Sequence, residues 1–266
     1  MKERILSLVS PEYPWKSHFH WLEETDSTND RLKAMARQGA PHGTVLIADR
    51  QTGGHGRMGR SFLSPGGVGI YFSILLRPQC SPMQLMHLTC ATAVAICDAV
   101  EAAAGFRPGI KWTNDLVFQR KKLGGILTEL GLSANGTVDY AIIGIGINCC
   151  QAEKDFAPEI REIAGSLSMV TGQTIDRCAV AAAMMDALHR MDQLLLTNKE
   201  AILNRYRKDC ITIGKEISLL RVGEEIRHGR AIDMDDAGAL IVKFSDGHVE
   251  TVSSGEVSVR GMYGYL

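Results

Sequence analysis

A glycine-rich stretch with interspersed cations is the clearest chemical feature of the sequence. It runs QTGGHGRMGRSF over residues 51–62 and carries His55, Arg57 and Arg60. Glycines let a backbone approach a ligand closely and direct N–H groups at an anion, and arginine donates paired hydrogen bonds to carboxylate or phosphate. No Asp or Glu occurs in residues 50–97, which disfavours the alternative of a mobile loop with solvated arginines. The stretch therefore predicts a loop that binds a polyanion.

The same stretch contains GHGRMG at residues 54–59, which has the spacing of a dinucleotide fingerprint. That fingerprint must directly follow a strand, open a helix and have an acid about 20 residues downstream. Here Pro65, Gly66 and Gly67 prevent a helix, and the acid is missing. The chain also lacks the GK[ST] of a phosphate-binding P-loop. The sequence thus argues against both nucleotide-binding motifs.

A second group of polar residues lies in KWTNDLVFQRKKLGGILTEL, residues 111–130. Its members are Lys111, Asn114, Asp115 and Lys122. Lys122 stands directly before a predicted strand in which Gly124 and Gly125 leave room beside the backbone. We expect the Lys122 ammonium to lie over a bound ligand, although surface lysines commonly serve only solubility.

The stretch AIIGIGINCC, residues 141–150, follows the two-residue period of a strand. Ile143, Ile145 and Ile147 share one face, and Gly144, Gly146 and Asn148 share the other. The second face is either a shallow trough for a ligand, ending in an amide, or the place where a helix crosses. The stretch alone leaves both interpretations open.

A polar tetrapeptide, DSTN at residues 26–29, precedes a helical pattern. Its Ser27, Thr28 and Asn29 are ordinary residues at a helix N-terminus, and taken alone the stretch favours that structural role. A ligand-binding role depends on the other three stretches.

These residues need a scaffold of alternating strands and helices, followed by a change of pattern. Strands are predicted at 18–25, 44–51, 68–76, 109–118, 122–130 and 139–150, with the fourth and fifth forming a hairpin. Helices are predicted at 29–38 and 83–104, and residues 160–209 have a helical pattern. After Gly214 only short strands and turns follow, which predicts a small antiparallel β-barrel.

Composition narrows the possible classes. The chain has 266 residues, of which 45% are hydrophobic, and 29 basic side chains stand against 30 acidic ones. Near-zero net charge argues against general nucleic-acid binding. Seven cysteines without a CxxC pair indicate reduced core thiols, and the absence of a signal peptide or an 18-residue apolar run predicts a cytoplasmic protein.

In combination, DSTN, GGHGRMGR, KWTND with KKLGGIL, and GIGIN, in this order and before a small C-terminal β-barrel, resemble the biotin protein ligase family over nearly the whole chain. The resemblance implies an α+β fold. A mixed β-sheet with flanking helices would form the catalytic domain at residues 1–212, and an SH3-like β-barrel would occupy residues 213–266.

The resemblance also implies an activity. Such an enzyme uses biotin, ATP and Mg²⁺ to make biotinyl-5′-AMP and pyrophosphate, and then transfers biotin to one lysine of the biotin carboxyl carrier domain of a carboxylase.

Family roles can be carried onto matching residues. Catalysis would fall to Arg57, Lys122 and Asp115, with Asp115 serving as a base for the acceptor lysine or as the metal ligand. The expected biotin-binding residues are Ser27, Thr28, Asn29, Gln51, Gly54, His55, Gly56, Arg57, Lys122 and Gly125. The expected ATP-binding residues are Arg57, Arg60, Phe62, Lys111, Asn114, Lys122 and Asn148, with Phe62 against adenine.

The sequence departs from the family pattern at several positions. His55 replaces an arginine, Phe62 replaces a frequent tryptophan, and Thr113 replaces the proline of KWPND. We expect loss of a fixed charge at His55, a smaller stacking surface at Phe62 and a looser turn at Thr113.

Partners and alternatives complete the predictions. We expect a carboxyl carrier protein as partner and no association with a membrane. We also expect no binding to DNA, because only some 25 residues precede DSTN. Monomer and homodimer both remain open. The alternatives are a lipoate or octanoate ligase of the same superfamily, and a biotin-sensing protein without catalysis.

Overall fold

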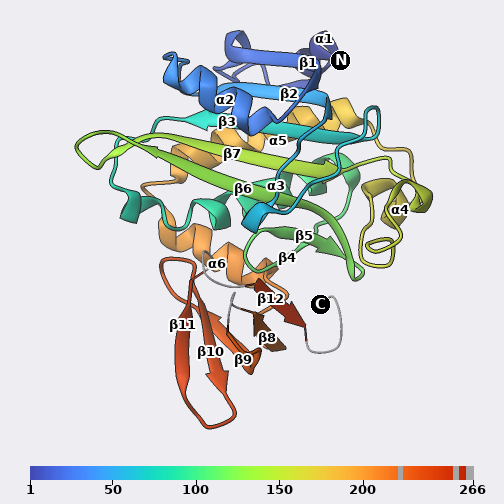
Figure 1. Ribbon diagram of the computed structural model, residues 1–266. Coiled ribbons are helices and arrows are strands. Elements are labelled where there is room, and N and C mark those ends of the chain that lie inside the picture. The colour runs from blue at the N-terminus through green and yellow to red at the C-terminus, as the bar shows by residue number, and fades with distance from the viewer. Residues whose placement is uncertain (221–223, 254–257, 262–266) are drawn as a thin grey trace.

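The computed structural model describes residues 1–220, 224–253 and 258–261, and its central feature is a seven-stranded mixed sheet (Figure 1). The strands run in the order β1-β2-β3-β7-β6-β5-β4. Strands β1 and β2 pair in parallel, and all other pairs in this sheet are antiparallel. The strands are β1 (Phe19–Thr25), β2 (Thr44–Gln51), β3 (Gly69–Leu76), β4 (Gly109–Lys111), β5 (Asp115–Phe118), β6 (Lys121–Leu132) and β7 (Val138–Asn148).

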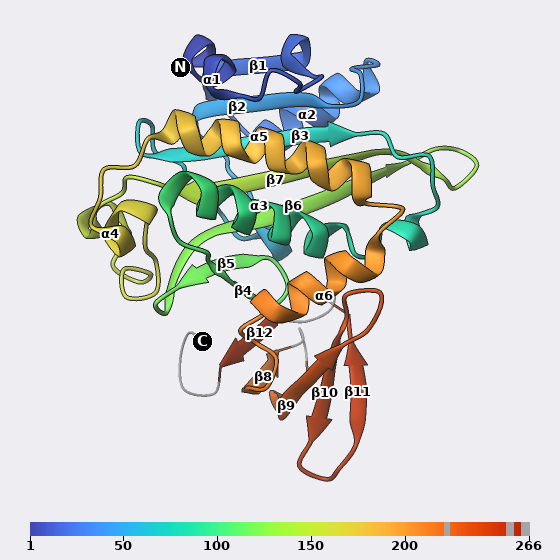
Figure 2. The ribbon, with the colours of Figure 1, turned by 180° about the vertical axis from the view of Figure 1, so that it is seen from behind.

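Helices cover both faces of this sheet. Viewed from behind, α3 and α5 lie side by side across one face, and α2 lies on the opposite face (Figure 2). The α-helices are α1 (Lys2–Leu8), α2 (Thr28–Arg37), α3 (Leu88–Ala104), α4 (Leu167–Thr171), α5 (Arg177–Leu194) and α6 (Lys199–Asp209). Short 3₁₀ turns are η1 (Lys16–His18), η2 (Arg57–Gly59), η3 (Pro82–Leu85) and η4 (Glu153–Asp155).

Local sequence signals set the helix ends. The Ser27 side chain accepts a hydrogen bond from the backbone N–H of Asp30 and so caps α2, as the DSTN stretch predicts. Asp176 caps α5 in the same way, through the N–H of Cys178. Helix α3 ends at Gly105, whose φ of 76° lies in the left-handed region that glycine adopts without a Cβ penalty.

The predicted alternation in β7 is confirmed. Ile143, Ile145 and Ile147 are buried in the large core beneath α3 and α5, whereas Ile142 belongs to a smaller cluster with Leu32 of α2. A strand with period two can supply both clusters because successive side chains point to opposite faces. The glycines of β7 therefore face the α2 side of the sheet.

One segment of the described chain, Pro82–Ala104, is long and apolar enough to cross a membrane by composition alone, but 72% of its apolar window is buried. It packs against the sheet and against α5, so its apolar character is that of a core helix. Of the seven cysteines, all free thiols, six are buried and Cys150 is half-buried, which agrees with the expected packing role.

A second sheet of five antiparallel strands follows α6, in the order β11-β10-β9-β8-β12. Its strands are β8 (Glu216–Leu220), β9 (Arg227–Met234), β10 (Leu240–Phe244), β11 (Val249–Val252) and β12 (Ser258–Gly261). The Trp112 indole N–H donates to the Gly238 carbonyl at 2.9 Å, which joins this sheet to the first. The architecture agrees with the predicted fold class, and the boundary at residues 212 and 213 stays a prediction.

The sequence prediction was wrong about residues 109–118. They do not form one strand but two, β4 and β5, which pair antiparallel around a tight turn at residues 112–114. The turn is well packed: Trp112 and Thr113 are both buried, and Tyr206 donates from its hydroxyl to the Thr113 carbonyl at 3.0 Å. The expected loosening at Thr113 is therefore not seen. The sequence ISLLRV, residues 217–222, predicts one of the short strands after Gly214, and its last two residues lie outside the described residues.

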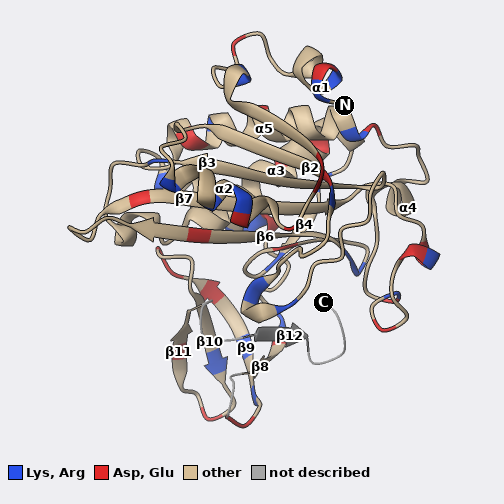
Figure 3. Ribbon diagram, turned by 45° about the horizontal axis from the view of Figure 1, so that its top comes forward, with Lys and Arg blue, Asp and Glu red and all other residues tan. Residues whose placement is uncertain are grey.

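Charge is distributed in small groups of both signs. Lys and Arg alternate with Asp and Glu over the two sheets and their helices (Figure 3). This pattern fits a net charge of −1 and places any anion site in a local feature of the fold.

The close approach of β6 and β7 gives a first prediction. A Cβ at Gly124 would lie 2.4 Å from the Gly146 carbonyl oxygen, and neither paired strand can move without losing hydrogen bonds. Gly124→Ala should therefore lower the free energy of unfolding by about 2 kcal/mol, measured by chemical denaturation. As a control, Gly53→Ala should change it by less than about 0.5 kcal/mol, because its nearest neighbour would be 3.5 Å away. Equal stability of the two variants would contradict this account of the strand contact.

Candidate active site

A cavity of about 640 Å³ lies between the glycine-rich loop and the α2 face of the sheet. Of the residues predicted for the site, only Gly54 is absent from its wall. The predicted residues that line it are Ser27, Thr28, Asn29, Gln51, His55, Gly56, Arg57, Arg60, Phe62, Lys111, Asn114, Asp115, Lys122, Gly125 and Asn148. Four stretches that are far apart in the sequence thus meet in one space.

Gly54 shapes the loop instead of lining the cavity. Its carbonyl accepts the N–H of Phe62 at 2.8 Å, and a Cβ here would lie 2.5 Å from the Phe62 carbonyl oxygen. Only glycine allows the two arms of the loop to approach this closely.

The glycine face of β7 provides the room that the sequence predicts. A Cβ at Gly144 would lie 2.2 Å from Oδ1 of Asn29, and one at Gly146 would lie 2.5 Å from the Phe62 ring. Asn29 comes from α2 and Phe62 from the loop, so the interpretation of a crossing helix is confirmed. The interpretation of a trough for a ligand stays a prediction.

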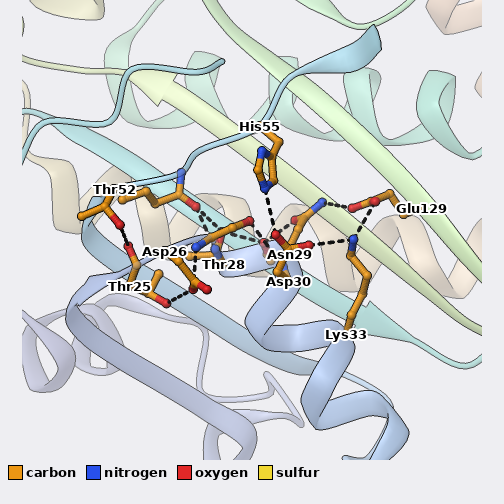
Figure 4. A network of polar contacts seen from close by, with 12 residues as sticks. Thr25, Asp26, Thr28, Asn29, Asp30, Lys33, Thr52, His55 and Glu129 are labelled. Atoms are coloured by element: carbon orange, nitrogen blue, oxygen red, sulfur yellow. Dashed lines mark hydrogen bonds and ion pairs between the residues drawn. The ribbon is translucent and has the colours of Figure 1, made fainter. Parts of the chain in front are cut away.

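A polar network closes one end of the cavity (Figure 4). Thr28 donates to Oε1 of Gln51 from its backbone N–H at 2.8 Å and from its hydroxyl at 3.0 Å. Asn29 donates from Nδ2 to Oε2 of Glu129 at 2.8 Å, and buried Ser73 lies within hydrogen-bond distance of both Thr28 and Asn29. These bonds fix the orientation of the polar groups that face the cavity.

The loop is tied down near its tip. His55 Nε2 lies 2.8 Å from Oδ2 of Asp30 on α2, as Figure 4 shows. Lys33 lies 2.8 Å from the other Asp30 oxygen and 2.7 Å from Glu129. The Lys33 hydrogen bond, and then that of His55, lowers the pKa of Asp30 against an opposing effect of burial. Asp30 is thus held as a carboxylate that can pair with His55.

The base of the loop is tied down as well. Gln51 donates to the Ser64 hydroxyl at 2.9 Å, which joins the two arms. Asp49 accepts the Gly67 N–H at 2.9 Å and pairs with Arg177 at 2.6 Å. Arg177 also donates to the Gly69 carbonyl, so the first residue of α5 holds both ends of the segment.

Arg57 is held in the wall of the cavity from the opposite side. It donates from Nη1 to Oδ1 of Asn114 at 3.0 Å, and Asn114 in turn donates to the Ile126 carbonyl at 2.9 Å. Burial lowers the pKa of Arg57, because desolvation disfavours the charged form, while the charge of Asp115 opposes this shift. Arginine stays protonated even so, and a partly desolvated guanidinium attracts an anion more strongly than one in water.

Lys122 supplies a second cation from β6. Its Nζ lies 2.6 Å from Oδ1 of Asp115 and would lie 3.6 Å from a Cβ on Gly125. Gly125 pairs with Gly146, so the ammonium crosses the glycine trough near its middle. The expected position of Lys122 over a ligand site fits this geometry, and Lys111 adds a third, buried cation to the wall.

Part of the cavity wall was not predicted. Tyr71, Trp112 and Gln151 line it, together with apolar residues of a segment that no motif marks. Those apolar residues are Phe156, Ile160, Ile163 and Ala164. The segment reaches the site because Lys122 bridges to Ala164 and donates its backbone N–H to the Ile163 carbonyl. Only the period-two pattern of β3 could have indicated Tyr71.

The arrangement suits the joining of two negatively charged groups. Hydrogen-bonding side chains line one end, apolar residues line the other, and Arg57 and Lys122 lie at the space between them. Two unit charges 4 Å apart repel by about 4 kcal/mol at an effective dielectric constant near 20, so such cations lower the barrier to their approach.

Comparison with known sequences identifies relatives for both parts of the chain. Residues 21–148 match the biotin/lipoate A/B protein ligase family, and residues 212–260 match the biotin protein ligase C-terminal domain. The bifunctional ligase/repressor BirA of Bacillus spizizenii is 33% identical over 91% of this chain and 74% of its own. The biotin–[acetyl-CoA-carboxylase] ligase of Mycobacterium tuberculosis is 32% identical over 89% of this chain and 86% of its own.

A solved structure shows the same fold with ligands bound. The biotin protein ligase of Aquifex aeolicus, in complex with biotin and ATP, superposes with a TM-score of 0.76 at 32% identity. The match covers 91% of this chain and 98% of that one.

The contact between His55 and Asp30 gives a prediction about the loop. Asp30→Asn should speed tryptic cleavage after Arg57 and Arg60 about two- to fivefold, because a solvent-screened pair contributes only ~0.5–1 kcal/mol and cleavage follows the open population. Mass spectrometry of the two cleavage products measures the rate.

Glu24→Gln is the matched control, since it breaks a similarly exposed pair with Arg50 that does not involve the loop tip. If Asp30→Asn and Glu24→Gln were cleaved at equal rates, the His55 contact would have no part in holding the loop.

Proposed function

The chain belongs to the biotin protein ligase family, and on that premise we propose how its cavity activates biotin with ATP and passes the biotinyl group to a lysine of an acceptor protein. The observation that carries this assignment is the meeting of Arg57 and Lys122, from a loop and a strand far apart in the sequence, on one cavity. That cavity can bring a carboxylate and a phosphate together.

The polar end of the cavity is our proposed site for the ureido head of biotin. Ser27, Thr28, Asn29 and Gln51 offer hydrogen-bonding groups there, already oriented by Ser73 and Glu129. A site with fixed polar groups rejects analogues that leave those groups unpaired. The absence of a side chain at Gly144 lets Asn29 pack against β7. The bicyclic ring would lie beside Asn29, and the valerate chain would extend along β7 toward Gly146.

The first chemical step takes place between the two ends. A biotin carboxylate oxygen attacks the α-phosphorus of ATP, a new O–P bond forms, and the bond to pyrophosphate breaks. Arg57 and Lys122 stabilise the charge that collects on the α-phosphate oxygens, and Gly56 lets the loop backbone approach the carboxylate. Arg60, Lys111 and Asn114 would hold the phosphates and ribose, and Phe62 would cover the adenylate.

The second step transfers biotin to the acceptor. A lysine has an ordinary pKa near 10.4, so its amine must lose a proton before it attacks the acyl carbon and releases AMP. Asp115 is the carboxylate nearest the reacting centre, 2.6 Å from Lys122. We propose that Asp115 orients Lys122 in the first step and accepts the amine proton in the second. The relatives' name points to a biotin carboxyl carrier domain as acceptor.

The site fits Mg²⁺ only as an ion that binds together with the nucleotide phosphates. Within the described residues no three His, Cys, Asp or Glu side chains form a metal-binding group, and Asp115 is already paired with Lys122. Mg²⁺ commonly takes one or two protein carboxylates and completes its shell with water and substrate phosphates. Asp115 would be its protein ligand, and the bound ion would neutralise phosphate charge.

Lipoate is the substrate to exclude, because the family that matches residues 21–148 includes lipoate ligases. Thermal stabilisation by biotin and by lipoate, each with and without a nonhydrolysable ATP analogue, separates the two. The polar network around Thr28 and Asn29 favours biotin, since the dithiolane ring of lipoate has no N–H or C=O to pair with it.

Activity is tested directly by pyrophosphate release. With biotin, ATP and Mg²⁺ the protein should release pyrophosphate and label a carrier domain, and Lys122→Ala should lower kcat/KM about 100- to 1,000-fold through loss of charge stabilisation. Lys243→Ala, a strand lysine of the second sheet, serves as the control and should retain the wild-type rate. Undiminished turnover in folded Lys122→Ala would instead favour a biotin-binding protein in which this lysine has no chemical role.

Arg57 gives a separate prediction about the intermediate. Arg57→Ala removes a charge-assisted contact to the adenylate and loosens the loop, so biotinyl-5′-AMP should escape and label bystander lysines about tenfold more. Mass spectrometry of an added lysine-rich protein measures the labelling, with Arg50→Ala as control, because Arg50 pairs with Glu24 and does not line the cavity. If the labelling of bystander lysines were unchanged in Arg57→Ala, Arg57 would have no role in retaining the intermediate.

A further inference from the structure

A carboxylate behind the polar end of the cavity holds one of the residues of its wall. Glu129 of β6 does not line the cavity, but its Oε2 accepts a hydrogen bond from Nδ2 of Asn29 at 2.8 Å, and its Oε1 pairs with Lys33 at 2.7 Å (Figure 4). Burial disfavours the charged form of Lys33, yet the hydrogen bonds of Asp30 and Glu129 outweigh this effect and raise its pKa. A charged Lys33 therefore stands beside the Glu129 carboxylate.

This carboxylate fixes the orientation of the Asn29 amide. A carboxylate can only accept hydrogen bonds, and the Leu127 carbonyl, 3.5 Å from Nδ2, can only accept as well. Nδ2 must therefore face Glu129, which leaves Oδ1 at 2.6 Å from the Ser73 hydroxyl. Rotating the Asn29 amide by 180° would set two acceptors against each other on the Glu129 side. The acceptor atom of Asn29 thus faces Ser73.

The direction of these hydrogen bonds passes through Ser73 to the cavity wall. Ser73 is buried and lies within hydrogen-bond distance of Asn29 and of Thr28, but it has one hydroxyl hydrogen. The shorter contact, with Asn29, requires that hydrogen, so the hydrogen in the 2.8 Å contact with Thr28 must come from the Thr28 hydroxyl. That hydroxyl also lies 3.0 Å from Oε1 of Gln51, and one hydrogen cannot serve both contacts.

Gln51 cannot supply a third hydrogen. Its Oε1 accepts the backbone N–H of Thr28 at 2.8 Å and its Nε2 donates to Ser64 at 2.9 Å, so the orientation of this amide is fixed too. The chain of contacts from Asn29 to Gln51 therefore has three links and two hydroxyl hydrogens. Thr28 and Gln51 line the cavity and Ser73 does not, so a donor that completes the chain must come from the cavity side.

We propose that Glu129 is a positioning residue for biotin recognition, because it sets the direction of this chain so that Thr28 and Gln51 accept a hydrogen bond from an N–H of the ureido ring. The inference rests on the proposed function. When a ureido N–H donates to Oε1 of Gln51, the Thr28 hydroxyl can donate to Ser73, and each oxygen of the chain has a hydrogen-bond partner. An analogue with oxygen in place of that N–H sets acceptor against acceptor and should bind poorly.

Glu129→Gln should reverse the chain. Lys33 can only donate, so the new amide must turn its oxygen toward Lys33 and its nitrogen toward Asn29. Asn29 then turns its own oxygen toward the new side chain, and each hydroxyl hydrogen moves one place along the chain. Oε1 of Gln51 accepts both the N–H and the hydroxyl of Thr28 in that state, and a donor from the ligand is no longer required.

Binding of biotin analogues tests the proposal. Calorimetry measures the Kd of biotin and of the two cyclic carbamates in which one or the other ureido N–H is replaced by an oxygen atom. The wild type should prefer biotin over at least one carbamate by about 100-fold, because a hydrogen bond is lost and two acceptors face each other. Glu129→Gln should lower that preference by about tenfold or more. Each preference is a ratio of two Kd values within one variant, so a misfolded fraction does not affect it.

Two further variants separate the direction of the chain from its charge. Lys33→Met removes the cation but keeps the Glu129 acceptor, so it should retain the preference; loss of the preference would assign the effect to the ion pair and overturn the proposal. Ser73→Ala interrupts the chain, releases the Thr28 hydroxyl and should lower the preference as Glu129→Gln does. An unchanged preference in Glu129→Gln or in Ser73→Ala, or equal binding of biotin and both carbamates by the wild type, also overturns the proposal. A folded wild type that does not bind biotin would instead refute the proposed function.

Discussion

The pairing of β6 with β7 through glycines on both strands is the constraint on which the site depends. Gly125 lies opposite Gly146, and Gly124 approaches the Gly146 carbonyl so closely that no side chain fits. The sheet is therefore hollow where Asn29, Phe62 and the Lys122 chain converge. A larger residue at Gly125 or Gly146 would fill part of the cavity in which the two reactants must meet, so the catalytic geometry depends on the absence of side chains at these positions.

Electrostatics then explains how a few cations can hold two negatively charged reactants in a protein of near-zero net charge. Arg57 is partly desolvated and fixed by Asn114, and Lys122 is fixed by Asp115. Fixed charges do not need to reorganise as charge moves between reactants. The same glycine loop that carries Arg57 is tied to α2 by Asp30 and to α5 by Arg177, so its freedom is restricted at both its tip and its base.

The sequence could predict the features that arise from local rules. The alternation in β7, the Ser27 cap and the clustering of cations in an acid-free interval each follow from a few adjacent residues, and the site they predict agrees with the cavity. The turn at residues 112–114 was missed as a strand break because the apolar residues on both sides of it suggested one continuous strand, although Asn114 and Asp115 are residue types that favour turns. Gln151 and the apolar segment to Ala164 were missed because tertiary contacts, the bridge from Lys122 to Ala164 among them, bring them to the site.

The hydrogen bond from Trp112 to Gly238 gives the small C-terminal sheet a structural connection to catalysis. Trp112 begins the turn that carries Asn114 and Asp115, its backbone N–H donates to Thr212, and Gly238 itself lies against Cys90 of α3. The hydrophobic core continues through Ile217 and Leu240 without a break. The two sheets therefore share one hydrophobic core, so displacement of the second sheet would distort the turn beside the reacting groups.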